Sequence, residues 1–142
     1  MFGDLQTIFD EAIDLKDFQT AFEWSERARS RAFRDLIRDR VVIPKASYVS
    51  IDSIRKKLVG NETLIEFHSL PTRLVFWVTG KNGLLNADVI NLSKEELTKR
   101  VEQIRSAMAN DIGEDPREDE RLRGTFAKTV YDDVLRPLRL DR

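Results

Sequence analysis

The chain has 142 residues, of which 41% are hydrophobic and 35% are charged, and its 24 basic and 25 acidic residues give a formal net charge of −1. This composition is typical of a folded domain and lies well away from that of intrinsically disordered chains. The net charge argues against a nucleic-acid-binding surface, which normally needs a basic domain or stripe. The sequence has no cysteine, which excludes disulfides, thiolate metal sites and a cysteine nucleophile within it. No apolar run approaches the ~18 residues that span a bilayer, and no signal-peptide pattern is present, so we expect a cytoplasmic protein.

Residues 1–40 are predicted to form a helical hairpin of the repeat type. The first helix has one apolar face, made by Leu5, Ile8, Phe9, Ala12 and Ile13. A turn follows at 14–17, with Asp17 as the expected N-cap of the second helix. The second helix, 18–40, carries an apolar stripe with a period of 3.6, made by Phe18, Ala21, Phe22, Ser25, Ala28, Ala32 and Leu36. Arg29 projects into this stripe, so its guanidinium must either extend to solvent or meet a carboxylate.

Residues 41–62 are predicted to be a linker followed by a short helix. Pro44 ends the helical tendency of the preceding segment because proline lacks a backbone N–H. Ser50 is the expected N-cap of a short helix over 51–58. Gly60 and Asn61 end that helix.

Three strands are predicted at 63–70, 73–79 and 84–91, as an antiparallel meander. A turn at Pro71 and Thr72 pairs Phe67 with Phe76, and a turn at Asn82 and Gly83 pairs Phe76 with Val89. Both turns place one apolar set on the same face, which is the predicted core: Ile65, Phe67, Leu74, Phe76, Val78, Leu85, Ala87 and Val89. The other face is mixed, so we expect part of it to be covered: Leu64, Glu66, His68, Val75, Trp77, Asp88 and Ile90.

Two helices are predicted after the strands. Ser93 and Glu96 have the spacing of a capping box, which begins a helix with Leu97, Val101, Ile104 and Met108 turned inward. After an acidic loop at 111–117, a last helix from about residue 118 is predicted to bury Leu122, Phe126, Val130 and Val134 and to end at Pro137. The predicted fold class is therefore α/β (α+β): a repeat-type helical hairpin, then a three-stranded antiparallel meander packed with two to three helices.

Four segments carry a pattern that extends over nearly the whole chain: AFEWSERARSRAFRDLI at 21–37, SIDSIRKKL at 50–58, TLIEF at 63–67 and YDDVLRPL at 131–138. In this order and spacing they resemble the front part of a CHAT domain, the caspase-like domain that follows tetratricopeptide repeats (TPR) in many bacterial proteins. The resemblance implies that 1–40 is the last repeat hairpin, 41–62 a linker with a short helix, and 63–142 the front of the CHAT-like α/β domain. It also implies that the catalytic histidine and cysteine of the family lie downstream, so no catalytic residue is assigned here.

Several residues allow both a chemical and a structural interpretation. His68, the only histidine, shares a strand face with Glu66, as a general base and its orienting carboxylate would. No cysteine or positioned serine accompanies the pair, so an ordinary sheet histidine is the simpler interpretation. The acidic loop has carboxylates that suit calcium, but its spacing matches no EF-hand, which favours a solvated loop.

The arginines of the second helix also have two interpretations. They lie at positions 27, 29, 31, 34, 38 and 40, where they would suit phosphate groups. Their spacing from Glu23, Glu26 and Asp35 instead favours ion pairs along a solvated helix.

Trp77 is either a binding hot spot or a core tryptophan beneath a helix. A possible interaction surface consists of Trp77, Val75, Ile90, Leu135 and Leu138.

Two functions follow from these observations. The first is the non-catalytic front portion of a repeat-linked caspase-like protein, which couples a sensing or docking region to a downstream protease-like half. The second is a self-contained protein–protein interaction or assembly module without protease activity. A nucleic-acid binder that uses the arginine helix is a third and weaker interpretation. For the first two we expect no enzymatic activity in this chain, no cofactor and no metal. The expected partners are proteins, including a second copy or the downstream half, rather than nucleic acid or membrane.

Overall fold

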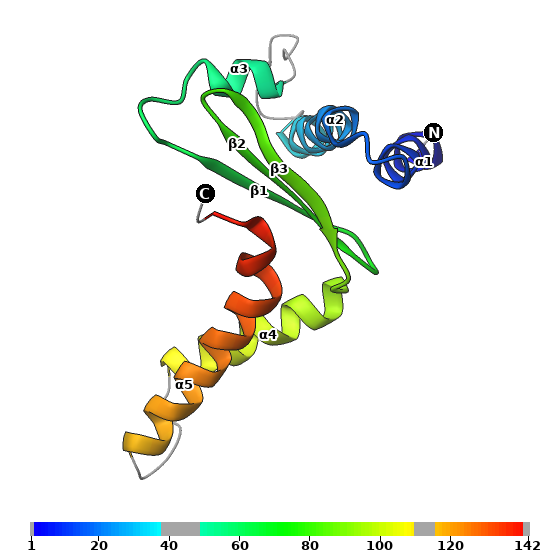
Figure 1. Ribbon diagram of the computed structural model, residues 1–142. Coiled ribbons are helices and arrows are strands. Elements are labelled where there is room, and N and C mark those ends of the chain that lie inside the picture. Colours follow the sequence, from blue (N-terminus) through cyan, green and yellow to red (C-terminus); the bar gives the residue numbers. More distant parts are fainter. Residues whose placement is uncertain (1, 38–48, 110–115, 141–142) are drawn as a thin grey trace. The chain divides into compact units, whose positions relative to one another are not determined.

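The computed structural model describes residues 2–37, 49–109 and 116–140 (Figure 1). Its elements are α1 (Phe2–Asp14), α2 (Phe18–Ile37), α3 (Ile51–Arg55), β1 (Leu64–Ser69), β2 (Leu74–Gly80), β3 (Gly83–Ile90), α4 (Lys94–Ala109) and α5 (Pro116–Val130). The strands form one antiparallel sheet in the order β1-β2-β3, so the predicted mixed α and β fold with a meander is confirmed. The chain divides into two compact units, residues 1–66 with 77–88 and residues 67–76 with 89–142, and each unit includes part of the sheet.

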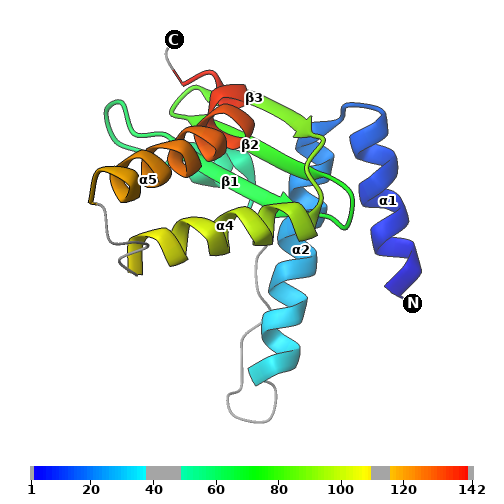
Figure 2. The ribbon, with the colours of Figure 1, turned by 90° about the horizontal axis from the view of Figure 1, so that it is seen from below.

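The first unit begins with the helical hairpin of α1 and α2 (Figure 2). The turn between the helices has Lys16 in the left-handed conformation (φ 57°), and the amide of Asp17 donates to the carbonyl of Ala12 at 2.8 Å. This is a Schellman ending, which satisfies carbonyls that α1 would otherwise leave without partners. The carboxylate of Asp17 then accepts from the amide of Thr20 at 3.1 Å, which confirms Asp17 as the N-cap of α2.

The buried face of the hairpin is shorter than its apolar periodicity predicted. Its buried apolar residues are Phe9, Ala12, Ile13, Ala21 and Phe22. Ala28 and Ala32 were expected in the same stripe but are exposed, and the buried polar residues Ser25 and Glu26 follow Phe22 instead. The periodicity identifies which face of a helix is buried, but not how far along the helix that burial extends. The predicted Leu5 and Leu36 lie outside the residues whose side chains are described, as does the linker around Pro44.

The short helix α3 has the predicted beginning but ends earlier than predicted. Ser50 is its N-cap and forms a reciprocal capping box with Ser53, with hydrogen bonds of 3.0 and 3.1 Å. The helix ends at Arg55 rather than Leu58, and Gly60 follows with φ 59°. A side chain at Gly60 would be strained in this conformation, which explains the glycine there.

The register of the first hairpin is confirmed by a hydrogen bond of 2.8 Å from the amide of Leu70 to the carbonyl of Arg73. This bond closes a two-residue turn at Pro71 and Thr72 and sets Phe67 opposite Phe76. The second turn differs, because β2 ends at Gly80 and β3 begins at Gly83. The turn therefore contains Lys81 and Asn82, one residue earlier than predicted. This moves the pairing of β3 with β2 by two residues, and because side chains alternate between faces with a period of two, each one stays on its predicted face.

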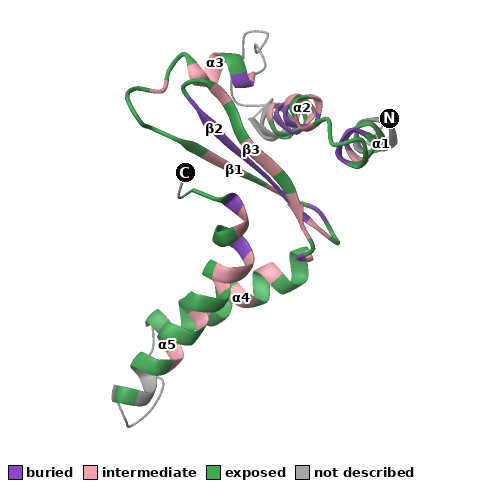
Figure 3. Cartoon of the chain, viewed as in Figure 1, coloured by how far each residue is buried: buried purple, intermediate pink, exposed green. Residues whose placement is uncertain are grey.

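The centre of the sheet is buried on both faces, whereas its edge strands are only partly covered (Figure 3). Every residue of β2 is buried, and Phe76 is fully so, as predicted. Phe67 on β1 and Leu85 on β3 were expected in the core but are 37% and 60% exposed. The alternation of apolar residues predicts the face on which each side chain lies, but it does not predict how far the edge strands are covered.

The second unit contains a smaller cluster, in which Leu74, Leu92 and Val134 are buried and contact Ile90, Leu97 and Val130. Helix α4 begins with the predicted capping box, in which the amide of Ser93 donates to Glu96 at 3.1 Å and the amide of Glu96 donates to Ser93 at 3.2 Å. Its inward face differs from the prediction. Val101 and Met108 are exposed and Leu97 and Ile104 are half-buried, whereas Ala107 is buried.

Helix α5 lies beside α4 (Figures 1 and 2) and ends through an irregular turn. The chain continues from α5 into a π-helical turn at Tyr131–Leu135 and a short 3-10 turn at Arg136–Leu138, and Arg139 is left-handed with φ 52°. Pro137 has no amide hydrogen to continue the helix, which accounts for the change of pattern. Val134 is buried as predicted, whereas Leu122, Phe126 and Val130 are half-buried. Within the described ranges, every helix is too short or too polar to cross a membrane.

Candidate functional site

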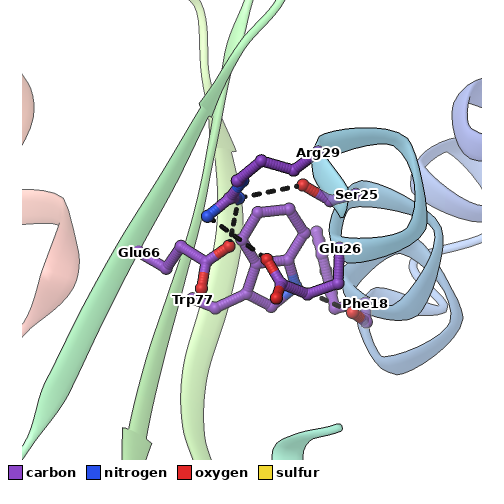
Figure 4. A network of polar contacts seen from close by, with 6 residues as sticks. All are labelled: Phe18, Ser25, Glu26, Arg29, Glu66 and Trp77. Atoms are coloured by element: carbon purple, nitrogen blue, oxygen red, sulfur yellow. Dashed lines mark hydrogen bonds and ion pairs between the residues drawn. The ribbon is translucent and has the colours of Figure 1, made fainter. Parts of the chain in front are cut away.

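The most developed set of specific contacts in the described residues lies where α2 meets the sheet of the first unit (Figure 4). At its centre is Trp77 on β2, whose side chain is fully buried. The indole ring meets the ring of Phe22 edge to face, with centroids 5.6 Å apart and planes at 80°. The Trp77 Nε1–H donates to the carbonyl oxygen of Phe18 at 2.7 Å. The tryptophan therefore fixes both the position of α2, through the ring contact, and its beginning, through the hydrogen bond.

A charged network lies beside this aromatic contact. The guanidinium of Arg29 on α2 donates to the carboxylate of Glu66 on β1, and its Nη2 also lies 3.3 Å from the hydroxyl of Ser25. Its Nη1 lies 3.2 Å from Glu26 Oε1. The Arg29 side chain is 52% exposed, while those of Glu26 and Glu66 are only 12% and 14% exposed. Arg29 thus extends past the apolar stripe and meets carboxylates, which confirms the expectation for it. Because Arg29 is half in solvent, its ion pairs contribute less to stability than fully buried pairs do.

Glu26 is the least satisfied member of the network. Its Oε1 is close enough to Arg29 for an ion pair, but no hydrogen bond from a described residue reaches that oxygen. Burial raises the pKa of the Glu26 carboxyl, and the charge of Glu66 and a hydrogen bond with it raise that pKa further, while Arg29 lowers it. Two carboxylates therefore lie around one cation, and Glu26 takes up a proton more readily than an ordinary glutamate does.

The possible interaction surface predicted from the sequence is not a continuous exposed surface. Trp77, Val75 and Leu138 are buried in the chain itself, so they are not available to a partner in this state. Ile90 is half-buried against the cluster of the second unit. Leu135 is 39% exposed. The prediction relied on the mixed polarity of one sheet face, and the structure shows that the apolar members of such a face on the central strand are covered.

His68 and Glu66, the two residues considered as a catalytic pair, have the following surroundings. Glu66 forms its ion pair with Arg29, and His68 is half-buried on the same strand. Groups of histidine and carboxylate residues that could hold a metal are absent from the described ranges. The acidic loop considered for calcium falls mostly outside those ranges, as do Arg34, Arg38 and Arg40.

Glu26 and its contact with Glu66 were missed by the analysis of the sequence. Glu26 had been assigned to ion pairs on a solvated helix, because it precedes Arg29 by three residues. One signal could have identified it: positions 22, 25, 26 and 29 lie together on a helix, so Glu26 shares a face with Phe22. Comparisons with family models, with curated proteins and with solved structures found no match to this chain.

Proposed function

We propose that this chain is the non-catalytic front portion of a repeat-linked, caspase-like (CHAT) protein, in which it couples a helical-repeat region to a downstream protease-like half. The observation that carries the proposal is the joint between α2 and the sheet. This joint consists of the Phe22–Trp77 contact, the hydrogen bond from Trp77 to Phe18 and the ion pairs of Arg29 with Glu66 and Glu26. A displacement of α2 would have to break these contacts or move the central strand with it.

The order of the elements supports the same proposal. A two-helix hairpin with a Schellman turn is followed by a capped short helix, a meander and two further helices. This order agrees with the four sequence segments that resemble the family. In this proposal the chain supplies no catalytic residue and no cofactor site, acts in the cytoplasm, and has as its partners the downstream half, other proteins or a second copy.

The proposal is tested first on the gene. We expect the longest reading frame that contains this segment to continue into a region with a histidine and, at the end of a later strand, a cysteine. A natural stop codon close to the codon for Arg142 would contradict the proposal. The second test uses the longer protein, in which peptide hydrolysis that depends on a repeat-region ligand should lose that dependence in Trp77→Ala and keep it in Met108→Ala, a matched change at an exposed position. Unchanged regulation in Trp77→Ala would rule out a coupling role for the joint.

The alternative function is a self-contained protein–protein interaction or assembly module. It is favoured by one observation: Trp77 is completely buried within this chain and contacts Phe22 of α2. Light scattering discriminates between the two functions. A front portion should self-associate through surfaces that another domain would cover, whereas a module complete in itself should remain monomeric at about 100 μM.

A further inference from the structure

The network between α2 and β1 contains more negative than positive charge. Glu26 and Glu66 both lie beside Arg29, which is their cation, and both carboxylates are largely removed from water. When both are ionised, the three residues carry a net charge of −1 in a poorly hydrated place. A single proton makes the group neutral, and it also supplies the hydrogen that a contact between two carboxyl groups requires.

We propose that Glu26, Arg29 and Glu66 form a proton-operated latch, which holds α2 firmly on β1 when Glu26 carries a proton and holds it more weakly when Glu26 ionises. The roles of the two acids differ. Glu66 accepts directly from the guanidinium of Arg29, so it is the direct partner of the cation. Glu26 has an oxygen without a hydrogen bond from the described residues and shares the guanidinium of Arg29 with Glu66, so it is the proton carrier.

The direction of the pH effect follows from the contacts of Glu26. Burial and the neighbouring Glu66 raise the pKa of Glu26 above its ordinary value of 4.5. The folded chain therefore binds this proton more tightly than the unfolded chain does. The stabilisation is fully present below the ordinary glutamate pKa, and it is lost as the pH rises through the raised value. The contribution of Glu26 to the joint is thus largest in acid and decreases as the pH rises toward neutral.

Glu66 and Arg29 are the charged groups of the described residues that shift the pKa of Glu26. Strand β2 has no ionisable residue, and Asp52 and Arg55 of α3 pair with each other at 2.7 Å. Among the residues whose side chains the structure describes, the remaining ionisable groups on α1, β1 and β3 are Asp10, Glu11, Asp14, His68 and Asp88. His68 ordinarily titrates in a neighbouring pH range, so its contribution has to be removed in the experiment.

The test uses the two tryptophans of the chain. A Trp24→Phe background leaves Trp77, which lies in the joint, as the only fluorescent indole. Urea unfolding is followed by this fluorescence between about pH 4 and pH 8, with His68→Gln included in every variant. Glu26→Gln, which imitates the protonated acid, should have a higher urea midpoint than its parent at neutral pH, and the two midpoints should converge in acid. Glu11→Gln on the exposed face of α1 is the matched control and should follow its parent at every pH.

Two results would overturn the latch. The first is a Glu26→Gln midpoint at or below that of the parent at neutral pH, and the second is a parallel pH profile for the two proteins. A carbon-13 NMR titration of the glutamate carboxyls gives an independent measurement, in which the resonance lost in Glu26→Gln should titrate at higher pH than that lost in Glu11→Gln. The latch itself requires only the joint, but its use in regulation rests on the proposed function. A confirmed pH effect without regulated hydrolysis in the longer protein would therefore reject the coupling and retain the latch.

Discussion

The two units of this chain attach their helices to the sheet residues in different ways. In the first unit, α2 is held by large aromatic rings, an indole hydrogen bond and a charged network on Glu66. In the second unit, α4 and α5 are held by a small aliphatic cluster around Leu74, an ion pair between Arg100 and Asp133, and a hydrogen bond of 2.7 Å from Arg123 to the carbonyl of Ala107. The first kind of contact is directional and fixes position and register, whereas the second depends mainly on buried area. In the proposed function, coupling therefore depends on the contacts of the first unit.

The largest expected effect is at Trp77. Trp77→Ala should lower the free energy of unfolding by about 3–5 kcal/mol, because it removes a fully buried indole together with its hydrogen bond. Chemical denaturation followed by circular dichroism measures the loss. Trp24→Ala is the control, since Trp24 is only half-buried and stacks with Arg27 at 4.7 Å, a contact worth about 1 kcal/mol or less. Similar losses in the two variants would contradict the central place of Trp77.

The corresponding change in the second unit is Leu74→Ala. Its expected cost is about 2–4 kcal/mol, since it opens a cavity in a cluster with few other large side chains. Hydrogen exchange should show faster exchange in α4 and in the end of α5 than in α1. Leu85→Ala on β3 is the control, because Leu85 is 60% exposed and its truncation should cost less than about 1 kcal/mol. Equal acceleration of exchange in α1 would mean that the two units unfold together, which would contradict the separate stabilisation of their helices.

The cap of α4 predicts a pH effect of opposite sign to that of Glu26. Hydrogen bonds from the backbone and side chain of Ser93 lower the pKa of Glu96 below its usual value of 4.5. Its stabilising effect is therefore present at neutral pH and is lost as the pH falls through the lowered value. Ser93→Ala should cost about 1 kcal/mol at neutral pH and less in acid. Thermal unfolding at several pH values measures this, and a cost that grows in acid would contradict the assignment.

The sequence predicted local structure more reliably than it predicted which side chains other segments bury. The caps at Asp17, Ser50 and Ser93 depend on neighbours a few residues away, and all three are confirmed. The face of each strand follows from alternation, so Phe76 was correctly placed in the core. Cover depends on contacts between segments that are distant in sequence. For that reason Phe67, Val101 and Ala28 were expected to be buried and are exposed.

The candidate site was only partly predictable for the same reason. Arg29 stood out because a cation within an apolar stripe needs a carboxylate or solvent. Its partner on β1 could not be identified from spacing, since 37 residues separate Arg29 from Glu66. The burial of Glu26 depends on the position of β1, which the local sequence does not reveal. From the sequence alone, Glu26 and the nearby Arg29 therefore have the spacing of an ordinary ion pair on a helix surface.

The smallest expected effect concerns α4, where Val101 and Met108 of the predicted inward face are exposed. Met108 is 72% exposed, and Met108→Ser should change the free energy of unfolding by less than about 0.5 kcal/mol, because its side chain is already in water. Ile104, four residues earlier, is half-buried, so Ile104→Ser should cost clearly more. Urea denaturation of both variants at low protein concentration measures the difference. Equal losses would mean that α4 is rotated relative to the described orientation, and the heptad-like spacing of Leu97, Val101, Ile104 and Met108 would then be its buried face. A small loss for Met108→Ser would confirm that Met108 is an apolar side chain on the outside of the second unit. Light scattering of the same variant at high concentration then tests whether Met108 contributes to self-association.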